Sequence, residues 1–342
     1  MTRIVAALIF VLGAIGLVFA ALVEPAALLR AWLTAWLVLI AAPIGAVFAG
    51  LTMALAPGPW TEKIAQPIRL LLLSLPVLSL GVIPVLFGLG ELYPWISPGE
   101  DAAHWVEPRG AWQEPLWFAL RQIVWLAILS GAALALATGR LGSQPVAGLV
   151  AIPVTLAASF FALDISMSLD AAFNSTIFGL YVIAGQAAAA LGVAITARVL
   201  TTDEAESVAG RPVWLLFGAC ALWGYHAFFQ YLIIWSGDLP RYAEWFLARN
   251  QGVWLIVIFV YAMLFARAFL LLIRPVRKRS RGLVTTAGGV AVGVGLETIW
   301  RTAPDLDPTP GWWAALTGWL ALFAGLGALV YSSRRRREAA HA

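Results

Sequence analysis

The sequence predicts an all-α integral membrane protein with about ten transmembrane helices in a bundle. Of its 342 residues, 61% are hydrophobic and only 12% are charged, which is about half the charged fraction of a typical soluble domain. A water-soluble fold could not bury that much apolar surface, whereas a lipid bilayer solvates it. The 17 Trp residues fit the same class, because their amphipathic rings collect where the membrane meets water.

Ten apolar segments are long enough to cross a bilayer, which takes roughly 20 residues in a helix. Charges, Pro or Gly bound each of them. The segments are 3–23, 30–56, 67–92, 115–138, 146–166, 174–199, 213–236, 252–273, 282–300 and 311–332. Together they predict a single polytopic membrane domain over 1–342, with an outer loop over 93–114 and a basic cytoplasmic tail over 333–342.

Three features of these segments refine the prediction. The apolar stretch of 3–23 exceeds the core of a typical signal peptide, which is about 7–15 residues, so an uncleaved first helix is expected. Segment 282–300 is short and Gly-rich, which favours close packing against other helices. Four Pro residues inside segments are expected to kink their helices, because neighbouring helices satisfy the freed carbonyls. They are Pro43, Pro76, Pro84 and Pro153.

The basic residues indicate an orientation. Arg and Lys gather at the N-terminus, in the loops after the second, fourth, sixth and eighth segments, and at the C-terminus. Acidic residues dominate the opposite side. Because cytoplasmic loops of membrane proteins are rich in Arg and Lys, the pattern predicts that both chain ends are cytoplasmic. The short basic clusters between apolar runs favour this topological role over nucleic-acid binding.

The residue types limit the cofactors that this chain alone could hold. A single cysteine, Cys220, allows neither an intrachain disulfide nor a Cys-ligated iron–sulfur cluster. One His within a predicted helix, His226, is too few for a haem with two His ligands. The sequence contains no Gly-rich phosphate loop and no HExxH pattern. We therefore expect no metal ligands, no catalytic residues and no cofactor bound by this chain alone.

Polar residues at membrane depth are the candidates for a site, because their burial in a bilayer is costly. His226 and Gln230 are four residues apart and share one helix face. Tyr181 and Gln186, on the preceding helix, could complete a network with them. One interpretation is a proton relay or a contact with a quinone carbonyl. The other is a hydrogen bond between neutral side chains that joins two helices.

Charged residues near the predicted outer ends of the helices are further candidates. Asp164 lies near the end of the fifth helix, and Asp170 precedes the sixth, where it is either a site residue or a helix cap. Glu297 and Arg301 are expected to pair, because residues four apart are neighbours on a helix surface. Arg121 is expected either to extend toward the interface or to pair with an outer acid.

Two segments resemble blocks of a known membrane subunit. They are ALDISMSLDAAFNSTIFGLYVIAG at 162–185 and WGYHAFFQYLIIWSGDLPRYAEWFLAR at 223–249. Their order and spacing resemble the second membrane subunit of alternative complex III, a quinol:cytochrome c oxidoreductase of the NrfD/PsrC-like superfamily, which also has ten helices. The chain departs from that pattern at Ala171 to Phe173, where the family often has Pro-His-Trp. It departs again at Arg241 and Tyr242, where the family often has Glu-Glu.

The resemblance implies a membrane subunit of a respiratory electron-transport complex in the bacterial inner membrane. In such complexes quinol is oxidised, and electrons pass to iron–sulfur and haem c subunits on the outer face, beside another membrane subunit. Asp164, Asp170, His226 and Gln230 are then candidates for a quinone contact or for proton translocation, without a redox centre in this chain. Two alternatives stay open, a secondary transporter of unknown substrate and a structural or assembly subunit. The two halves share no motif, although transporters often contain internal repeats.

Overall fold

The computed structural model describes residues 3–96, 110, 112–202 and 208–341. This part of the chain is helical and contains no strand. Ten of its helices are long and apolar enough to cross a membrane, so the chain is an all-α integral membrane bundle, as predicted. The predicted outer loop, 93–114, falls mostly outside the described residues.

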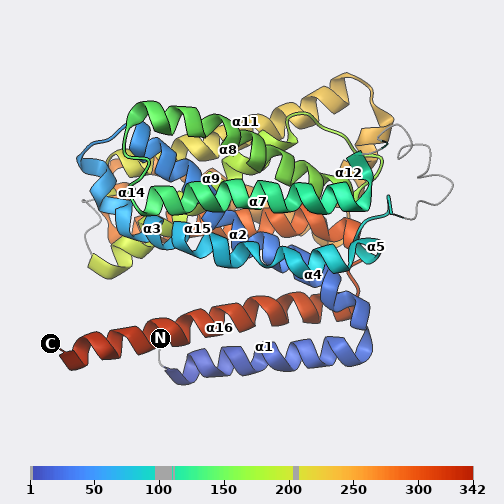
Figure 1. The fold of residues 1–342 in the computed structure, drawn as a ribbon, viewed down its shortest axis with the longest axis horizontal. Coiled ribbons are helices and arrows are strands. Elements are labelled where there is room, and N and C mark those ends of the chain that lie inside the picture. Colours follow the sequence, from blue (N-terminus) through green and yellow to red (C-terminus); the bar gives the residue numbers. More distant parts are fainter. Residues whose placement is uncertain (1–2, 97–109, 111, 203–207, 342) are drawn as a thin grey trace. The chain divides into compact units, whose positions relative to one another are not determined.

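The membrane-crossing helices lie close to the predicted segments (Figure 1). They are α1 (Arg3–Val23), α2 (Pro25–Leu55), α3 (Pro59–Ser79) continued by α4 (Val82–Phe87), α7 (Pro115–Ala137), α8 (Gln144–Ile165) continued by η2 (Met167–Leu169), α9 (Phe178–Thr202), α11 (Arg211–Ser236), α13 (Gly252–Ala266) continued by η3 (Arg267–Leu272), α15 (Ser280–Thr302) continued by η4 (Ala303–Leu306), and α16 (Pro310–His341). Three short helices lie between them: α5 (Leu89–Leu92), α12 (Pro240–Arg249) and α14 (Arg274–Lys278).

Several predicted helix boundaries are wrong by more than four residues. α2 begins at Pro25 and α3 at Pro59, because Pro suits the first turn of a helix, where its missing N–H is not needed. α3 also carries Glu62 in its first turn, where a negative charge complements the helix dipole. The predicted tail, 333–342, is helical as far as His341, since α16 continues through a stretch rich in Arg.

By its internal contacts the chain divides into two compact units. Unit 1 comprises Met1–Leu37 and Thr302–Ala342, and unit 2 comprises Val38–Arg301. Two compact units can be parts of one membrane domain, so the single polytopic domain stays a prediction.

Unit 1 is built on α1 and α16, which run antiparallel, so that both chain ends lie at the same end of the pair (Figure 1). Glycines let the two backbones approach closely. A Cβ atom on Gly13 would lie 2.6 Å from Leu322 N, and one on Gly325 would lie 2.6 Å from Phe10 N. Small residues at such contacts are typical of helices that associate within a bilayer.

Unit 2 is built around α9, which is the most buried of the candidate spans. α9 contacts α3, α8 and α11. α15 comes so near that a Cβ atom on Gly192 would lie 2.6 Å from Ala287 O, which confirms the close packing expected for 282–300. The four Pro residues singled out above all lie within helices.

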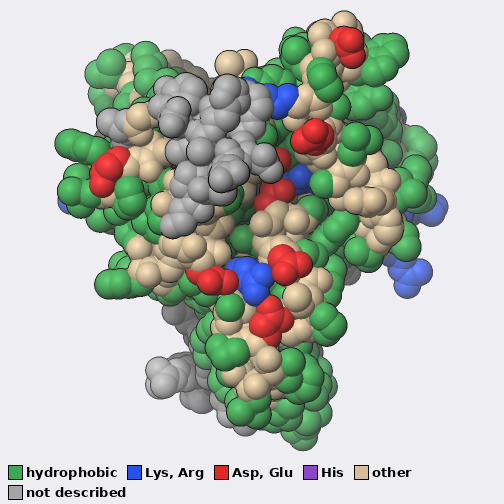
Figure 2. All heavy atoms as spheres, turned by 90° about the vertical axis from the view of Figure 1, so that its right-hand side faces the viewer, with side chains coloured by type: hydrophobic (Ala, Val, Ile, Leu, Met, Phe, Trp, Pro, Cys, Tyr) green, Lys and Arg blue, Asp and Glu red, His purple; other side chains and the backbone are tan. Residues whose placement is uncertain are grey.

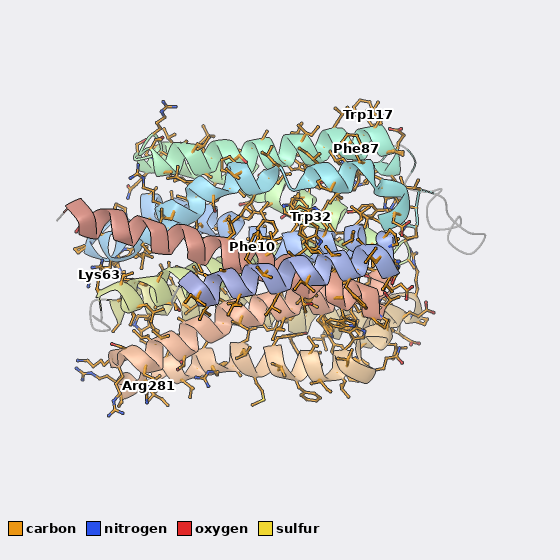
Figure 3. All side chains as sticks on the ribbon, turned by 90° about the horizontal axis from the view of Figure 1, so that it is seen from below. Phe10, Trp32, Lys63, Phe87, Trp117 and Arg281 are labelled. Carbon is orange, nitrogen blue, oxygen red and sulfur yellow. The ribbon has the colours of Figure 1, made fainter. Side chains whose placement is uncertain are left out.

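Charged side chains separate toward the two ends of unit 2. Lys63 and Arg281 lie at one end, and Trp117 lies at the other (Figure 3). The end that carries α12 has acidic side chains spread over its surface (Figure 2). This separation agrees with the alternation of charges along the sequence. The cytoplasmic location of the basic end stays a prediction.

Candidate functional site

A dense set of buried hydrogen bonds surrounds Asp164, near the C-terminal end of α8, where only 2% of the residue is exposed. Arg121 donates to its carboxylate through Nε at 3.1 Å and Nη2 at 3.2 Å, and Gln122 donates through Nε2 at 2.9 Å. The indole N–H groups of Trp112 and Trp125 donate at 3.1 and 3.3 Å. Four side chains therefore converge on one carboxylate, which in its ionised form only accepts hydrogen bonds. Arg121 pairs with Asp164, one of the acids that the sequence predicts at the outer side.

The start of α7 positions these donors. Pro115 opens the helix, and the Glu114 carboxylate caps it by accepting from Trp117 N at 2.9 Å. Arg121 and Trp125, four residues apart, then point from the same face of α7. Trp112 precedes the helix, and the Arg121 guanidinium lies 4.0 Å from the centre of its ring. Arg121 Nη2 also donates to Trp112 O at 2.6 Å, so its position is fixed from two sides.

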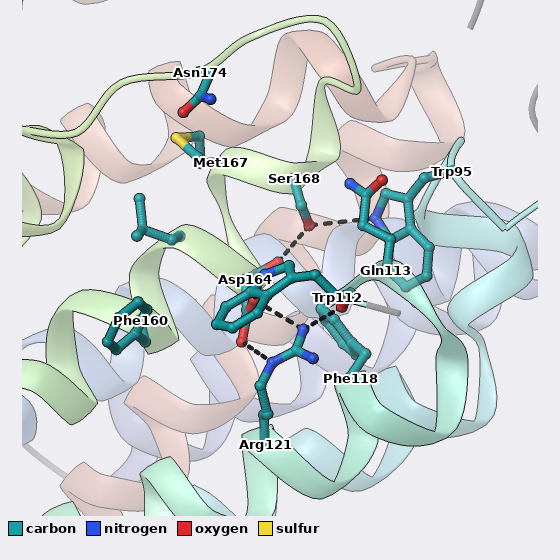
Figure 4. Close-up of a pocket in the computed structure, with 11 residues that line it drawn as sticks. Trp95, Trp112, Gln113, Phe118, Arg121, Phe160, Asp164, Met167, Ser168 and Asn174 are labelled. Carbon is teal, nitrogen blue, oxygen red and sulfur yellow. Dashed lines mark hydrogen bonds and ion pairs between the residues drawn. The ribbon is translucent and has the colours of Figure 1, made fainter. Parts of the chain in front are cut away.

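A cavity of about 290 Å³ lies beside the ion pair (Figure 4). Aromatic side chains and a few polar groups line it. They include Trp95, Trp112, Gln113, Phe118, Phe160 and Asn174. Gln113 is buried, and its Oε1 atom accepts no hydrogen bond from any described residue. Apolar walls with a few polar groups are typical of small-molecule sites.

The connection after α8 is tied to the same place. The Tyr93 hydroxyl donates to Ile165 O at 3.0 Å, and the Ser168 hydroxyl donates to Asp164 O. Burial, and to a smaller extent the charge of Asp164, raise the pKa of Tyr93 well above its usual value. The phenol therefore stays protonated and keeps its role as a donor.

A second buried cluster joins α9 to α15. Glu297 Oε1 accepts from the Tyr181 hydroxyl at 2.6 Å and from Arg301 Nε at 2.9 Å. The side chains of Arg301 and Glu297 are 5% and 4% exposed. Their pairing confirms the prediction from the four-residue spacing. Tyr181, which the sequence analysis names as one residue that could complete a network with His226 and Gln230, hydrogen-bonds Glu297.

The last turn of α8 and the residue after it connect the two clusters. Asp164 accepts from the donors of α7, whereas the Ser166 hydroxyl accepts from Arg301 Nη1 at 2.6 Å. Two buried ion pairs, Asp164–Arg121 and Glu297–Arg301, are thus attached to chain positions only two residues apart. They form one network in unit 2.

α12 adds a buried cation that the sequence analysis missed. Arg249 has no exposed surface. It donates to Trp245 O and Arg301 O, both at 2.9 Å, and its guanidinium lies 3.8 Å from the centre of the Trp245 ring. An Arg beside a loop is ordinarily solvated. The one available signal was Trp245, four residues earlier on the same helix face.

His226 and Gln230 are buried on one face of α11, as predicted, with 7% and 4% exposed. Gln230 Oε1 accepts from the Ser175 hydroxyl at 3.1 Å. His226 Nδ1 makes no hydrogen bond within the described part of the chain. Gln230 also lies between two cavities of about 220 and 250 Å³, the first of which Tyr181 lines as well.

The remaining two candidates take part in neither ion pair. Asp170 Oδ1 accepts from the N–H groups of Ala172 and Phe173 at 2.8 and 3.0 Å. It therefore stabilises a turn in the loop and does not cap α9. Gln186 is buried on α9, and its Oε1 atom has no hydrogen-bond partner among the described residues.

This arrangement holds two carboxylates within the membrane protein. One cavity lies beside Asp164, and another lies beside the Tyr181 phenol that hydrogen-bonds Glu297. Such groups can exchange a proton or bind a ring that carries polar substituents. No group of three or more His, Cys, Asp or Glu side chains that could hold a metal ion occurs in the described ranges. No protein-family model matches the chain, and no curated protein matches it either.

Proposed function

We propose that this chain is a membrane subunit of a quinol-oxidising electron-transfer complex in the bacterial inner membrane. In that complex, electrons from quinol would pass to iron–sulfur and haem c subunits on the outer face. This chain would contribute a proton path or a quinone contact through the network of Asp164 and Glu297. It would hold no redox centre of its own.

The observation that carries the proposal is the meeting of the two resembling segments in one buried network. Asp164, Ser166 and Tyr181 come from segment 162–185. Gln230, Trp245 and Arg249 come from segment 223–249. Ser166 and Arg249 both contact Arg301, and Tyr181 and Gln230 line the same cavity. Residues that share a resemblance to one family are thus gathered around the same buried charges.

Physical chemistry supports a functional role for these charges. Ionisable side chains inside a membrane are costly to bury and commonly mark proton or substrate paths. Quinol oxidation releases protons, which need acceptors near the quinol ring. Glu297 is the better candidate acceptor, because Tyr181 gives it a hydrogen-bonded neighbour that can pass a proton to the adjoining cavity.

Purification of the tagged chain from native membranes under mild conditions tests the assignment. Mass spectrometry of the purified sample should identify iron–sulfur and haem c subunits. Its optical spectrum should show haem that quinol reduces. A chain that purifies alone, without haem or iron–sulfur protein, would contradict the proposal.

A variant pair tests the role of the network. Glu297→Gln keeps the size of the side chain and one acceptor oxygen but removes the carboxylate. We expect the quinol-dependent reduction of cytochrome c by membranes that contain this variant to fall about 10²-fold or more. Glu244→Gln is the matched control, because Glu244 is exposed on α12. Equal activity of both variants would place Glu297 outside the proton path.

A further inference from the structure

A cavity of about 350 Å³ lies between the ends of α2, α3 and α7 in unit 2, and none of its lining residues belongs to the network above. Its lining is almost entirely apolar or glycine. The apolar part consists of Met53, Ala54, Pro57, Ala65, Ile68, Leu72, Leu136, Ala137 and Leu141. Only two lining side chains are polar, Thr61 and Arg69. A cavity with apolar walls and one cation suits a molecule with an apolar chain and an anionic group.

Arg69 is held in a fixed orientation at this cavity. Its Nε atom donates to Ala137 O at 3.1 Å, and Ala137 is the last residue of α7. The hydrogen bond satisfies a carbonyl that the end of the helix leaves without an internal partner. Arg69 forms no ion pair with another described residue, and its side chain is exposed. Its two Nη groups therefore stay available as donors.

The position of Arg69 fits the level of lipid headgroups. α3 begins at Pro59, but its strongly apolar part begins near residue 67. α7 ends at Ala137, opposite Arg69, and α8 begins nearby, since Gln144 Nε2 donates to Leu55 O at the end of α2 at 3.0 Å. The membrane-crossing parts of four helices thus end together around this cavity.

We propose that this cavity binds an anionic phospholipid, with the phosphate on Arg69 and part of an acyl chain against the apolar walls. A guanidinium donates two parallel hydrogen bonds to phosphate oxygens. Basic pockets between transmembrane helices are a recurring mode of anionic lipid recognition. The inference does not depend on the proposed function, because the site shares no residue with the Asp164 and Glu297 network.

Charge at this end of unit 2 favours an anionic lipid over a zwitterionic one. Lys63 lies on α3, one and a half turns before Arg69, and Arg140 follows the end of α7. Lys63 and Arg281 both lie at this end of the unit (Figure 3). The general attraction of these cations is distinct from the site, however, and the experiment separates the two.

Native mass spectrometry of the full chain in detergent measures the binding directly. The probes are phosphatidylglycerol and phosphatidylcholine with the same acyl chains. The wild-type chain should bind phosphatidylglycerol about tenfold more tightly, because both lipids carry the phosphate but the cations at the site repel the choline group of phosphatidylcholine. Arg69→Gln should weaken both lipids, since both lose the phosphate contact, and should reduce the preference for phosphatidylglycerol. Ala54→Phe should weaken both lipids, because the new ring fills the apolar part of the cavity.

Arg140→Gln is the control for general attraction, because Arg140 is exposed and does not line the cavity. It should keep most of the affinity for both lipids, because Arg140 attracts the lipid without a direct contact in the cavity. A loss as large as that of Arg69→Gln would overturn the site in favour of unspecific charge. Unchanged binding by Ala54→Phe would overturn the placement of the acyl chain. Displacement of the lipid by inorganic phosphate at similar concentration would show an anion site without lipid and would also overturn the proposal.

Folding of each variant is checked by its elution as a single species in size-exclusion chromatography. If Arg69→Gln does not fold, Arg69→Lys replaces it. A lysine keeps the charge but cannot form the fork of hydrogen bonds, so the variant should lose several-fold in affinity for phosphatidylglycerol. An unchanged affinity would contradict the role assigned to the guanidinium.

Discussion

The two ion pairs of unit 2 have the same chemistry but different surroundings. Asp164 and Arg121 come from two helices, and the side chain of Arg121 keeps 15% of its surface exposed beside a cavity. Glu297 and Arg301 come from one helix, and neither side chain is more than 5% exposed. Asp164 accepts from four side chains, whereas Glu297 accepts from two. The Asp164 pair therefore has more hydrogen bonds, whereas the Glu297 pair is more completely enclosed.

The difference determines what happens when one partner is removed. A buried charge without its partner is strongly destabilising, because the protein interior cannot replace the lost solvation. Arg121 has a second acceptor in Trp112 O and can reach solvent. Among the described residues, Arg301 would keep the hydroxyl groups of Ser166 and Thr298 and the ring of Phe178 at 5.7 Å. The pair with fewer hydrogen bonds should thus be the more sensitive one.

The largest effect is expected for Glu297→Ala. It leaves the Arg301 guanidinium enclosed without a carboxylate, so the free energy of unfolding should fall by about 3–5 kcal/mol. Titration of the purified protein from mild detergent into SDS measures this change. Glu244→Ala, at an exposed position, should stay within about 0.5 kcal/mol of the wild type. If Glu297→Ala lost less unfolding free energy than Asp164→Ala, the Asp164 pair would be the more sensitive of the two.

Asp164→Ala should have a smaller effect, a loss of about 1–3 kcal/mol. Gln122 Nε2 becomes a buried donor without its acceptor, but Arg121 retains Trp112 O and access to solvent. The same SDS titration applies. In addition, the fluorescence of the protein should change, because Trp112 and Trp125 both lose a hydrogen bond. A loss above 4 kcal/mol, well outside the expected range, would show that the cavity does not relieve the charge of Arg121.

The sequence could predict both partners of the Glu297–Arg301 pair. For the other pair it could predict Arg121 but not which acid is its partner. Glu297 and Arg301 are neighbours by helical spacing alone, so their contact needs no knowledge of the fold. The partner of Arg121 could be limited to an outer acid, but Asp164 lies 43 residues away. The choice among acids depends on which helices pack together. For the same reason the sequence could not predict the hydrogen bond between Tyr181 and Glu297, which are 116 residues apart.

Other differences have local causes. Hydropathy located the helices, because crossing a bilayer requires a long apolar run. It missed the starts at Pro25 and Pro59. α2 extends through apolar residues that precede Arg30, whereas α3 extends through polar residues beyond its apolar part. Arg249 was missed because its charge suggested a solvated position, whereas its guanidinium lies on an aromatic ring and donates to two carbonyls. Hydropathy does not reveal such compensation.

The packing of α9 against α15 should also affect the stability of the Glu297 pair, because it sets the position of Glu297 beside Tyr181. Gly192→Ala places a methyl group 2.6 Å from Ala287 O, so the helices must shift, at a cost of about 1–3 kcal/mol. Gly218→Ala is the matched control on α11, where a Cβ atom meets nothing within 4 Å. There the better helix propensity of Ala should add about 0.5–1 kcal/mol. Equal stability of the two variants would mean that α15 is not closely held at this point.

The smallest effect is expected for Tyr181→Phe, which removes one of the two donors to Glu297 and leaves the ion pair intact. The loss should be about 1 kcal/mol, the net value of one hydrogen bond. Glu297→Ala in the Tyr181→Phe background then separates the two contributions. If the phenol acts only through the carboxylate, the double variant should be no less stable than Glu297→Ala alone. A further loss of about 1 kcal/mol would mean that the Tyr181 hydroxyl stabilises the protein independently of Glu297, because Phe keeps the ring.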